Sequence, residues 1–228
     1  ARTTGLMATI RCIETATKNC SVALSVNGKV IALQEDNLKN EPGKHFSHAE
    51  KLQGYITQVL DQANISKNDL QAIAVSKGPG SYTGLRIGVS TAKGLCYALD
   101  IPLLAISTLG SLARQVKGSV VVPMLDARRM EVYSAVFSSE MDQIRDIQAQ
   151  IITQDSFNTY LNQGMVTFIG DGVEKFEAVC AHPNAVFIKN ALPSASQMAQ
   201  IATLKFTQND TQDVAYFEPY YLKDFISL

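Results

Sequence analysis

The sequence predicts an α/β protein built from two similar halves. Short apolar segments of strand length alternate with longer segments of helical period along the chain. One pattern, a strand that ends in an acid followed by a turn and a second strand, occurs twice, with the acids at Glu14 and Asp126, about 110 residues apart. The 228 residues, 46% of them hydrophobic, suffice for one large core or two smaller ones.

The composition indicates a globular protein without an extreme charge. With 20 Lys+Arg against 21 Asp+Glu, the chain lacks the excess of cations that a principal nucleic-acid-binding surface needs. No apolar run approaches the roughly 18 residues of a membrane-spanning helix. Four cysteines without a C-x-x-C pair favour buried thiols in a reducing cytoplasm. We interpret residues 1–6 as added sequence and Met7 as the native start.

The first half opens with three strands of an antiparallel meander. Residues 7–14 (MATIRCIE) are predicted as the first strand, residues 21–26 alternate as the second, and residues 29–34 follow as the third. Asn27-Gly28 joins the second and third strands and is a strong hairpin signal, because both turn positions favour positive φ.

Two helices and two further strands complete this half. Ser47 and Glu50 fit a capping box at the start of a helix. The apolar residues that follow have helical spacing: Leu52, Tyr55, Ile56, Val59, Leu60 and Ala63. Residues 72–76 form a short apolar strand that leads through a glycine-rich loop into a second helix at about 83–98, and a strand follows at 103–106.

The second half repeats the strand pattern of the first. A short helix at 108–115 precedes an apolar strand at 120–125, the acid Asp126, a charged turn and a strand at 131–137. The remaining predicted elements are a helix at 157–161, a strand at 167–170 and a capped helix at 194–206.

The glycine-rich stretch KGPGSYTGLRIG, residues 77–88, does not fit a standard phosphate loop. It lacks the Lys-Ser/Thr pair of a Walker loop, the third glycine of G-x-G-x-x-G, and the G-x-S-x-G of a nucleophile elbow. Its small residues instead recur every four positions, at Gly80, Gly84, Gly88 and Ala92, which places them on one face of a helix. That face either packs on the protein's own sheet or forms a seam with a helix of another subunit.

Several segments, taken in order, resemble the TsaB (YeaZ) family. They are IETATKNCSVAL, FSHAEKLQGYITQVL, GPGSYTGLRIGVSTAKGL, IPLLAISTL and LDARRMEVYSAVF, and the ending PYYLK is similar to the family's P-x-Y-L-R. The resemblance extends from Met7 to about Phe225, and GPGSYTGLRIG is its most specific part.

This resemblance implies both a fold and a cellular role. The fold would be that of the actin-like, sugar-kinase and Hsp70-like superfamily: two duplicated ribonuclease-H-like domains with mixed sheets flanked by helices, at 7–107 and 108–228, with the C-terminal segment able to pack back on the first domain. The role would be that of a non-catalytic, cytoplasmic subunit required for threonylcarbamoyladenosine modification of tRNA. Such a subunit binds and activates a TsaD-like transferase and works with a TsaE-like ATPase.

The same resemblance implies partners and cofactors. The chain would form a homodimer when its partner is absent, would meet tRNA only through the complex, and would not contact a membrane. It would hold no cofactor by itself, with ATP and a metal ion on the partner subunits. Contacts would use the two first-domain helices, at about 47–64 and 83–98, and the expected interface residues are Leu52, Tyr55, Ile56, Val59, Gly80, Ser81, Thr83, Gly84, Arg86, Gly88 and Ala92.

The nucleotide site expected of that superfamily is degenerate here. Glu14 replaces the usual aspartate of the first hairpin, and Ala16 stands where active members have a glycine that approaches phosphate. The second half offers Asp126, again without a glycine. The matching degenerate positions are Glu14, Thr15, Thr17, Asp126, Gly170 and Gly172. We therefore do not expect ATP hydrolysis by this chain alone, although an active ATPase or phosphotransferase is the alternative.

Other candidate functional side chains have simpler interpretations. The chain has three histidines and no H-E-x-x-H, so a metallopeptidase, which the older glycoprotease description suggests, is disfavoured and no metal ligands are predicted. We expect His45 and His48 to be solvated near a helix start and His182 to lie in a loop. Ser81 or Thr83 is expected to cap the second helix, and Arg86 either bonds within its own domain or reaches across a subunit seam.

Overall fold

The computed structural model describes residues 8–36 and 48–222, which form two compact units. The first unit contains the described residues up to Ile106 together with Ser194–Tyr220, and the second contains Ser107–Pro193 followed by Tyr221 and Leu222. The sequence prediction placed the boundary between residues 107 and 108 and allowed the C-terminal segment to pack back on the first domain. In the structure, Ser194–Tyr220 belong to the first unit, where the helical residues 195–207 pack on the first sheet.

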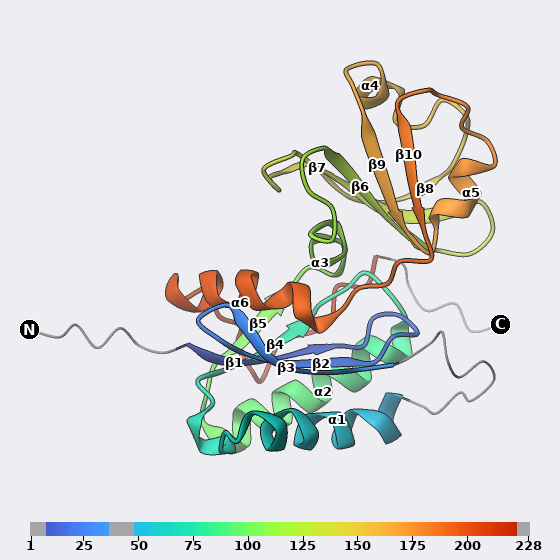
Figure 1. The fold of residues 1–228 in the computed structure, drawn as a ribbon. Coiled ribbons are helices and arrows are strands. Elements are labelled where there is room, and N and C mark those ends of the chain that lie inside the picture. The colour runs from blue at the N-terminus through green and yellow to red at the C-terminus, as the bar shows by residue number, and fades with distance from the viewer. Residues whose placement is uncertain (1–7, 37–47, 223–228) are drawn as a thin grey trace, which may run out of the picture. The chain divides into compact units, whose positions relative to one another are not determined.

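The first unit is a five-stranded mixed sheet with helices on both faces (Figure 1). Its strand order is β3-β2-β1-β4-β5, with β1, β2 and β3 antiparallel and β4 and β5 parallel to β1. The strands are β1 (Thr9–Glu14), β2 (Ser21–Val26), β3 (Lys29–Glu35), β4 (Ala72–Ser76) and β5 (Leu103–Ile106). The helices are α1 (His48–Ala63), the 3-10 turn η1 (Lys67–Asp69), α2 (Tyr82–Leu99), the 3-10 turn η2 (Ala195–Gln197) and α6 (Met198–Thr207).

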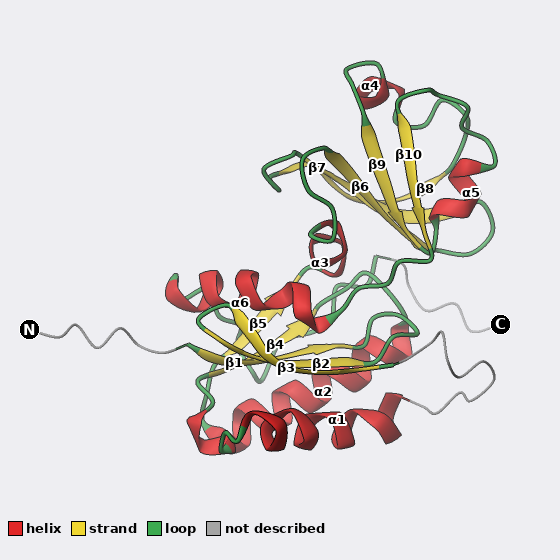
Figure 2. Ribbon diagram, in the orientation of Figure 1, coloured by secondary structure: helices red, strands yellow, loops and turns green. Residues whose placement is uncertain are grey.

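Alternation along the strands divides this core into two layers. Ile13 faces α1 and α2, whereas its neighbour Cys12 faces α6, as expected from the two-residue period of a strand. Figure 2 shows α1 and α2 side by side on one face of the sheet and α6 on the other. Thus the carboxyl ends of β1 and β4 meet at one edge, directly before the hairpin and the glycine-rich loop.

The second unit repeats this topology. Its strand order, β10-β9-β6-β7-β8, matches the first with the same parallel and antiparallel pairs. The strands are β6 (Val120–Asp126), β7 (Glu131–Phe137), β8 (Gln143–Ile151), β9 (Val166–Gly170) and β10 (Ala185–Lys189), and the helices are α3 (Thr108–Ala113), α4 (Asn158–Leu161) and α5 (Val173–Glu177). The repeated order confirms the predicted α/β fold of two duplicated halves.

Most predicted elements are present, with small shifts of their ends. The exceptions are β8, β10 and α5, which the sequence did not predict. Three expectations fall outside the described residues: the native start at Met7, the capping role of Ser47 and the position of His45. None of the helices in the described part is long and apolar enough to cross a bilayer. All four cysteines are buried and without a disulfide.

Candidate functional site

The candidate site lies where β1 and β4 end, between two connections that we name the hairpin turn (residues 15–20) and the glycine loop (residues 77–81). β1 and β4 are parallel and adjacent, so both connections leave the sheet at the same edge. In open α/β sheets, this edge is where ligands usually bind. The distance between the two connections therefore decides whether a phosphate could lie between them.

The hairpin turn and the glycine loop are in direct contact. The Ser81 N–H donates to the Ala16 carbonyl at 2.7 Å, and the Thr15 hydroxyl donates to the Gly84 carbonyl at 2.7 Å. A Cβ at Gly80 would lie 2.4 Å from the Ala16 carbonyl oxygen, closer than the 3.0 Å that real Cβ atoms respect. The two connections are thus hydrogen-bonded to one another, which leaves no gap for a phosphate between them.

The helix face of small residues is turned toward its own domain. A Cβ at Gly84 would lie 2.1 Å from the Thr15 carbonyl oxygen, and one at Gly88 would lie 2.2 Å from the Thr15 Oγ1. Ala92 is fully buried in the core. The hypothesis that Gly80, Gly84, Gly88 and Ala92 form a seam with another subunit is wrong for that face, because it packs inside the same unit. The alternative, packing within the protein, is confirmed, but the partner is the hairpin turn more than the sheet.

The apolar face of α1 requires the same correction. Leu52, Ile56 and Val59 are buried against the sheet, with at most 6% of any of them exposed. Helical spacing identified a face that is buried, and that face anchors the helix to its own domain. The buried face of α1 is therefore not available to another subunit.

Glu14 ends β1 beneath the two connections and is completely buried. Its Oε1 accepts the Ala16 N–H at 2.7 Å and the Ser76 hydroxyl at 2.8 Å. Its Oε2 has no hydrogen-bond partner among the described residues. Burial raises the pKa of Glu14 to about 7, against the lowering effect of these hydrogen bonds. The carboxyl group therefore holds the hairpin turn to the end of β4 and has no contact with solvent.

The carboxylate of Asp126, the equivalent acid of the second unit, is also bound by groups of its own unit. Its Oδ1 accepts Lys175 Nζ at 2.5 Å and the Arg128 N–H at 2.7 Å. Partial burial favours the protonated acid, but the bonds from Lys175 and Arg128 outweigh it, so the pKa of Asp126 is lowered. At Gly170, one of the predicted degenerate nucleotide-site positions, the backbone is closely packed: its φ is +138°, and a Cβ there would lie 1.9 Å from the Met124 carbonyl oxygen.

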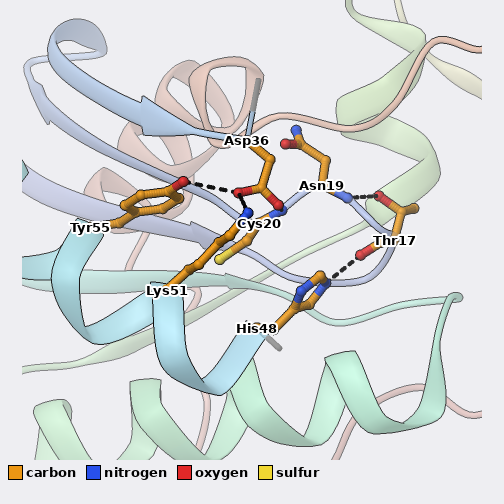
Figure 3. Close-up of polar contacts among 7 residues, drawn as sticks. All are labelled: Thr17, Asn19, Cys20, Asp36, His48, Lys51 and Tyr55. Atoms are coloured by element: carbon orange, nitrogen blue, oxygen red, sulfur yellow. Dashed lines mark hydrogen bonds and ion pairs between the residues drawn. The ribbon is translucent and has the colours of Figure 1, made fainter. Parts of the chain in front are cut away.

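The start of α1 is fixed to the hairpin turn and to the end of β3 by polar contacts that the sequence did not reveal (Figure 3). The Asp36 Oδ1 accepts Lys51 Nζ and the Tyr55 hydroxyl, each at 2.9 Å, and the side chain of Asp36 is only 5% exposed. His48 contacts the Thr17 carbonyl through Nε2, which must carry the proton because a carbonyl only accepts. The expectation that His48 is merely solvated is therefore wrong.

α1 and α2 together border a shallow hollow of about 340 Å³. It is lined by Ala49, Leu52, Gln53, Arg86, Ile87, Ser90 and Thr91. Arg86 and Ser90 are exposed. Arg86 lies over the Tyr82 ring at 5.3 Å and donates to its hydroxyl at 3.0 Å, so it bonds within its own helix. We name the side of the two helices that borders this hollow the α1–α2 face.

The other predicted positions have structural roles. Ser81 caps α2 by accepting the Gly84 N–H at 3.2 Å, as predicted, whereas Thr83 is exposed and takes no part in the cap. His182 lies in a loop beside Asn162. Within the described ranges, no group of three or more His, Cys, Asp or Glu side chains could hold a metal ion.

Comparison with known proteins gives the family. Residues 44–225 match the family model described as TsaD: tRNA N6-adenosine threonylcarbamoyltransferase. The chain belongs to this family, on its TsaB (YeaZ) branch.

Relatives and solved structures agree over nearly the full chain. The tRNA threonylcarbamoyladenosine biosynthesis protein TsaB of Escherichia coli is 29% identical over 94% of each chain, and that of Haemophilus influenzae is 28% identical over 95% of this chain and 94% of the relative. The TsaB of Bacillus subtilis is 37% identical over 57% of this chain and 55% of its own length. The crystal structure of YeaZ from Pseudomonas aeruginosa is 26% identical, with a TM-score of 0.82 over 95% of this chain and 100% of that one.

Proposed function

We propose that this chain is a non-catalytic subunit that binds and activates a TsaD-type threonylcarbamoyltransferase during threonylcarbamoyladenosine modification of tRNA. Membership of the TsaB branch supports the pathway, because relatives that cover nearly the whole chain are named for it. The observation that carries the non-catalytic role is the direct contact between the hairpin turn and the glycine loop, which fills the space above Glu14.

The state of the two acids supports the same role. A carboxylate that holds Mg²⁺ must be ionised and must reach the ion, as in ATPases of this superfamily. Glu14 is buried with its pKa raised to about 7, and Asp126 is paired with Lys175. Because one carboxyl group is buried and the other is paired, these acids favour the accessory role over the alternative of an active ATPase or phosphotransferase.

The partner would dock on the α1–α2 face, since the small-residue face is occupied internally. Contacts within the first unit hold both helices in place. Lys51 and Tyr55 bind α1 to Asp36, and the hydroxyl of Thr15 in the hairpin turn binds α2 at the Gly84 carbonyl. A rigid surface loses little entropy on binding. In this proposal, ATP and a metal ion belong to the TsaD-type and TsaE-type partners, tRNA is met through the assembled complex, and a homodimer through the same face forms when the partner is absent.

Reconstitution of the modification tests the proposal. Purified TsaD-type and TsaE-type proteins of the same organism, with an activated threonylcarbamoyl donor and tRNA, should form the modified nucleoside only when this chain is added. Glu14→Gln should keep most of that activity, because the residue supports a loop and touches no substrate. Ser90→Arg, on the α1–α2 face, should abolish pairing in a pull-down, while Leu204→Arg on α6, across the sheet, should not.

Two results would contradict this function. One is modification at an equal rate without the chain. The other is magnesium-dependent ATP turnover by the purified chain that Glu14→Gln removes. Replacement of Gly84 or Gly88 is not a suitable test of pairing, because it would disturb the fold itself.

A further inference from the structure

Two tyrosines on the first unit are almost completely exposed. Tyr97 on α2 is 85% exposed, and Tyr216, in the segment that follows α6, is 84% exposed. Burial of an aromatic ring is a large source of binding free energy, and Tyr is enriched at the centres of protein interfaces. Two aromatic rings with this degree of exposure are therefore candidates for contact with a partner.

The backbone that carries Tyr216 is held in a fixed turn. The Asp213 Oδ1 accepts the N–H groups of Ala215 at 2.8 Å and Tyr216 at 3.1 Å, and the Phe217 N–H donates to the Asp213 carbonyl at 2.9 Å. Val214 and Phe217, which precede and follow Tyr216 in the chain, both pack against the core. The turn buries its apolar neighbours and leaves one aromatic ring pointing outward.

The same turn is attached to α2 beside Tyr97. Lys93 Nζ donates to the carbonyls of Ala215 at 3.1 Å and Phe217 at 3.0 Å, the two residues that flank Tyr216. Tyr97 follows Lys93 by four residues and lies one helical turn further along the same side. The two rings therefore belong to one surface, presented by a helix and by a turn bound to it.

This surface continues the α1–α2 face along α2. Ser90, Gly94 and Tyr97 are all exposed and are spaced by four and three residues, so they form one row on the helix. A Cβ added at Gly94 would meet nothing within 4 Å, so a partner can approach the α2 backbone closely there. The row leads from the hollow to the tyrosines without a bulky side chain in between.

The charges around the tyrosines indicate what they would bind. Exposed carboxylates flank both rings, Asp100 after Tyr97 and Asp213 and Glu218 beside Tyr216. Lys93 also lies here, and its ammonium group donates to the carbonyls of Ala215 and Phe217. An aromatic and acidic surface repels nucleic-acid phosphates and suits arginine, whose guanidinium stacks on tyrosine while it pairs with a carboxylate.

We infer that Tyr97 and Tyr216 are anchor residues of the partner interface, and that they receive an arginine-bearing segment of the TsaD-type subunit. This inference rests on the proposed function and extends the docking surface from the α1–α2 face to the turn after α6. The chain contains the same type of contact, since Arg86 stacks on Tyr82. Lys93 is a positioning residue, because it holds the turn and is itself covered by it.

Titration calorimetry of the full chain against the TsaD-type protein of the same organism tests the inference. Tyr97→Ala and Tyr216→Ala should each weaken binding about tenfold or more, because truncation of an aromatic anchor residue to alanine typically lowers the affinity at least that much. The phenylalanine variants should bind nearly as well as the unaltered chain because they retain the ring. Leu204→Ala, a truncation of an exposed apolar side chain on α6, should change the affinity less than twofold.

A photo-crosslinking amino acid at position 216 identifies the occupant. It should capture the TsaD-type subunit, at a peptide that contains arginine. Binding unchanged in both alanine variants, or a crosslink only to a second copy of this chain or to tRNA, would overturn the inference while the proposed function stands. If the unaltered chain does not bind the TsaD-type protein, the proposed function fails and the inference with it.

Discussion

Gly84 and Gly94 lie on the same helix in opposite environments, and their alanine variants should therefore change stability in opposite directions. A methyl group at Gly84 would lie 2.1 Å from the Thr15 carbonyl oxygen, whereas one at Gly94 would meet nothing within 4 Å. Intrinsic helix propensity favours both substitutions by about 1 kcal/mol. The difference between the two variants thus isolates the contact with the hairpin turn.

The structure gives the size of the effect. To clear a backbone oxygen, the hairpin turn must move by roughly 1 Å, and overpacking of this kind costs about 1–3 kcal/mol. The movement also strains the bond from the Thr15 hydroxyl to the Gly84 carbonyl, whose loss costs about 1 kcal/mol. After the gain in helix propensity, Gly84→Ala should lower the free energy of unfolding by about 1–3 kcal/mol. Gly94→Ala should raise it by about 0.5–1 kcal/mol.

Urea unfolding followed by far-ultraviolet circular dichroism measures both changes. Because two units can unfold separately, hydrogen exchange of the α2 amides should be recorded in parallel to assign the change to the first unit. If Gly84→Ala proves as stable as Gly94→Ala, the hairpin turn does not rest on α2. In that case the space above Glu14 would be open, and the argument for a non-catalytic chain would lose its main support.

Three further predictions concern the polar groups of the two units. The folded pKa of Glu14, about 7, exceeds its unfolded value near 4.5, so the native state binds more protons than the unfolded state. The free energy of unfolding should therefore fall by on the order of 3 kcal/mol as the pH rises between these values. Glu14→Gln should remove this pH dependence in unfolding experiments. Tyr55→Phe leaves the nearly buried Asp36 without one donor and should cost about 1–2 kcal/mol in thermal unfolding, with the loss seen as faster exchange in α1. Lys175→Met should raise the pKa of Asp126, as measured by NMR titration of its carboxyl carbon, with a stability change below about 1 kcal/mol because the pair is partly exposed.

Local signals in the sequence predicted much of the fold. The hairpin at Asn27-Gly28 and the cap at Ser81 depend on residues close in the chain, so both could be read directly. β8 was missed because glutamine and charged residues occupy most of its half-solvated positions, and its pairing with β7 comes from the tertiary structure. The return of residues 194–220 to the first unit depends on contacts with distant residues that no local pattern encodes.

The candidate site shows a different limit of sequence reasoning. Spacing established that Gly80, Gly84 and Gly88 share one face of a helix, but spacing does not say what that face meets. A smooth glycine face suits a neighbouring subunit and a neighbouring loop equally well. Likewise, Asp36 and Lys51 are 15 residues apart on different elements, so their ion pair became visible only in three dimensions.

The two strand-end acids give a second, independent argument for the proposal that this chain contributes a surface and no chemical step. They occupy equivalent positions in two units of the same topology, yet each is used differently: Glu14 by burial beneath two connections, Asp126 by an ion pair with Lys175 on α5. A carboxylate that binds Mg²⁺ must be ionised and open to the ion, whereas Glu14 is buried with a raised pKa and Asp126 is paired with Lys175. If the proposed function holds, replacement of either acid by a neutral group of similar shape should change stability alone. Glu14→Gln and Asp126→Asn combined should therefore support threonylcarbamoyladenosine formation in the reconstituted system at close to the normal rate. Loss of modification by a doubly substituted chain that still binds its partner would show that the acids take part in the reaction.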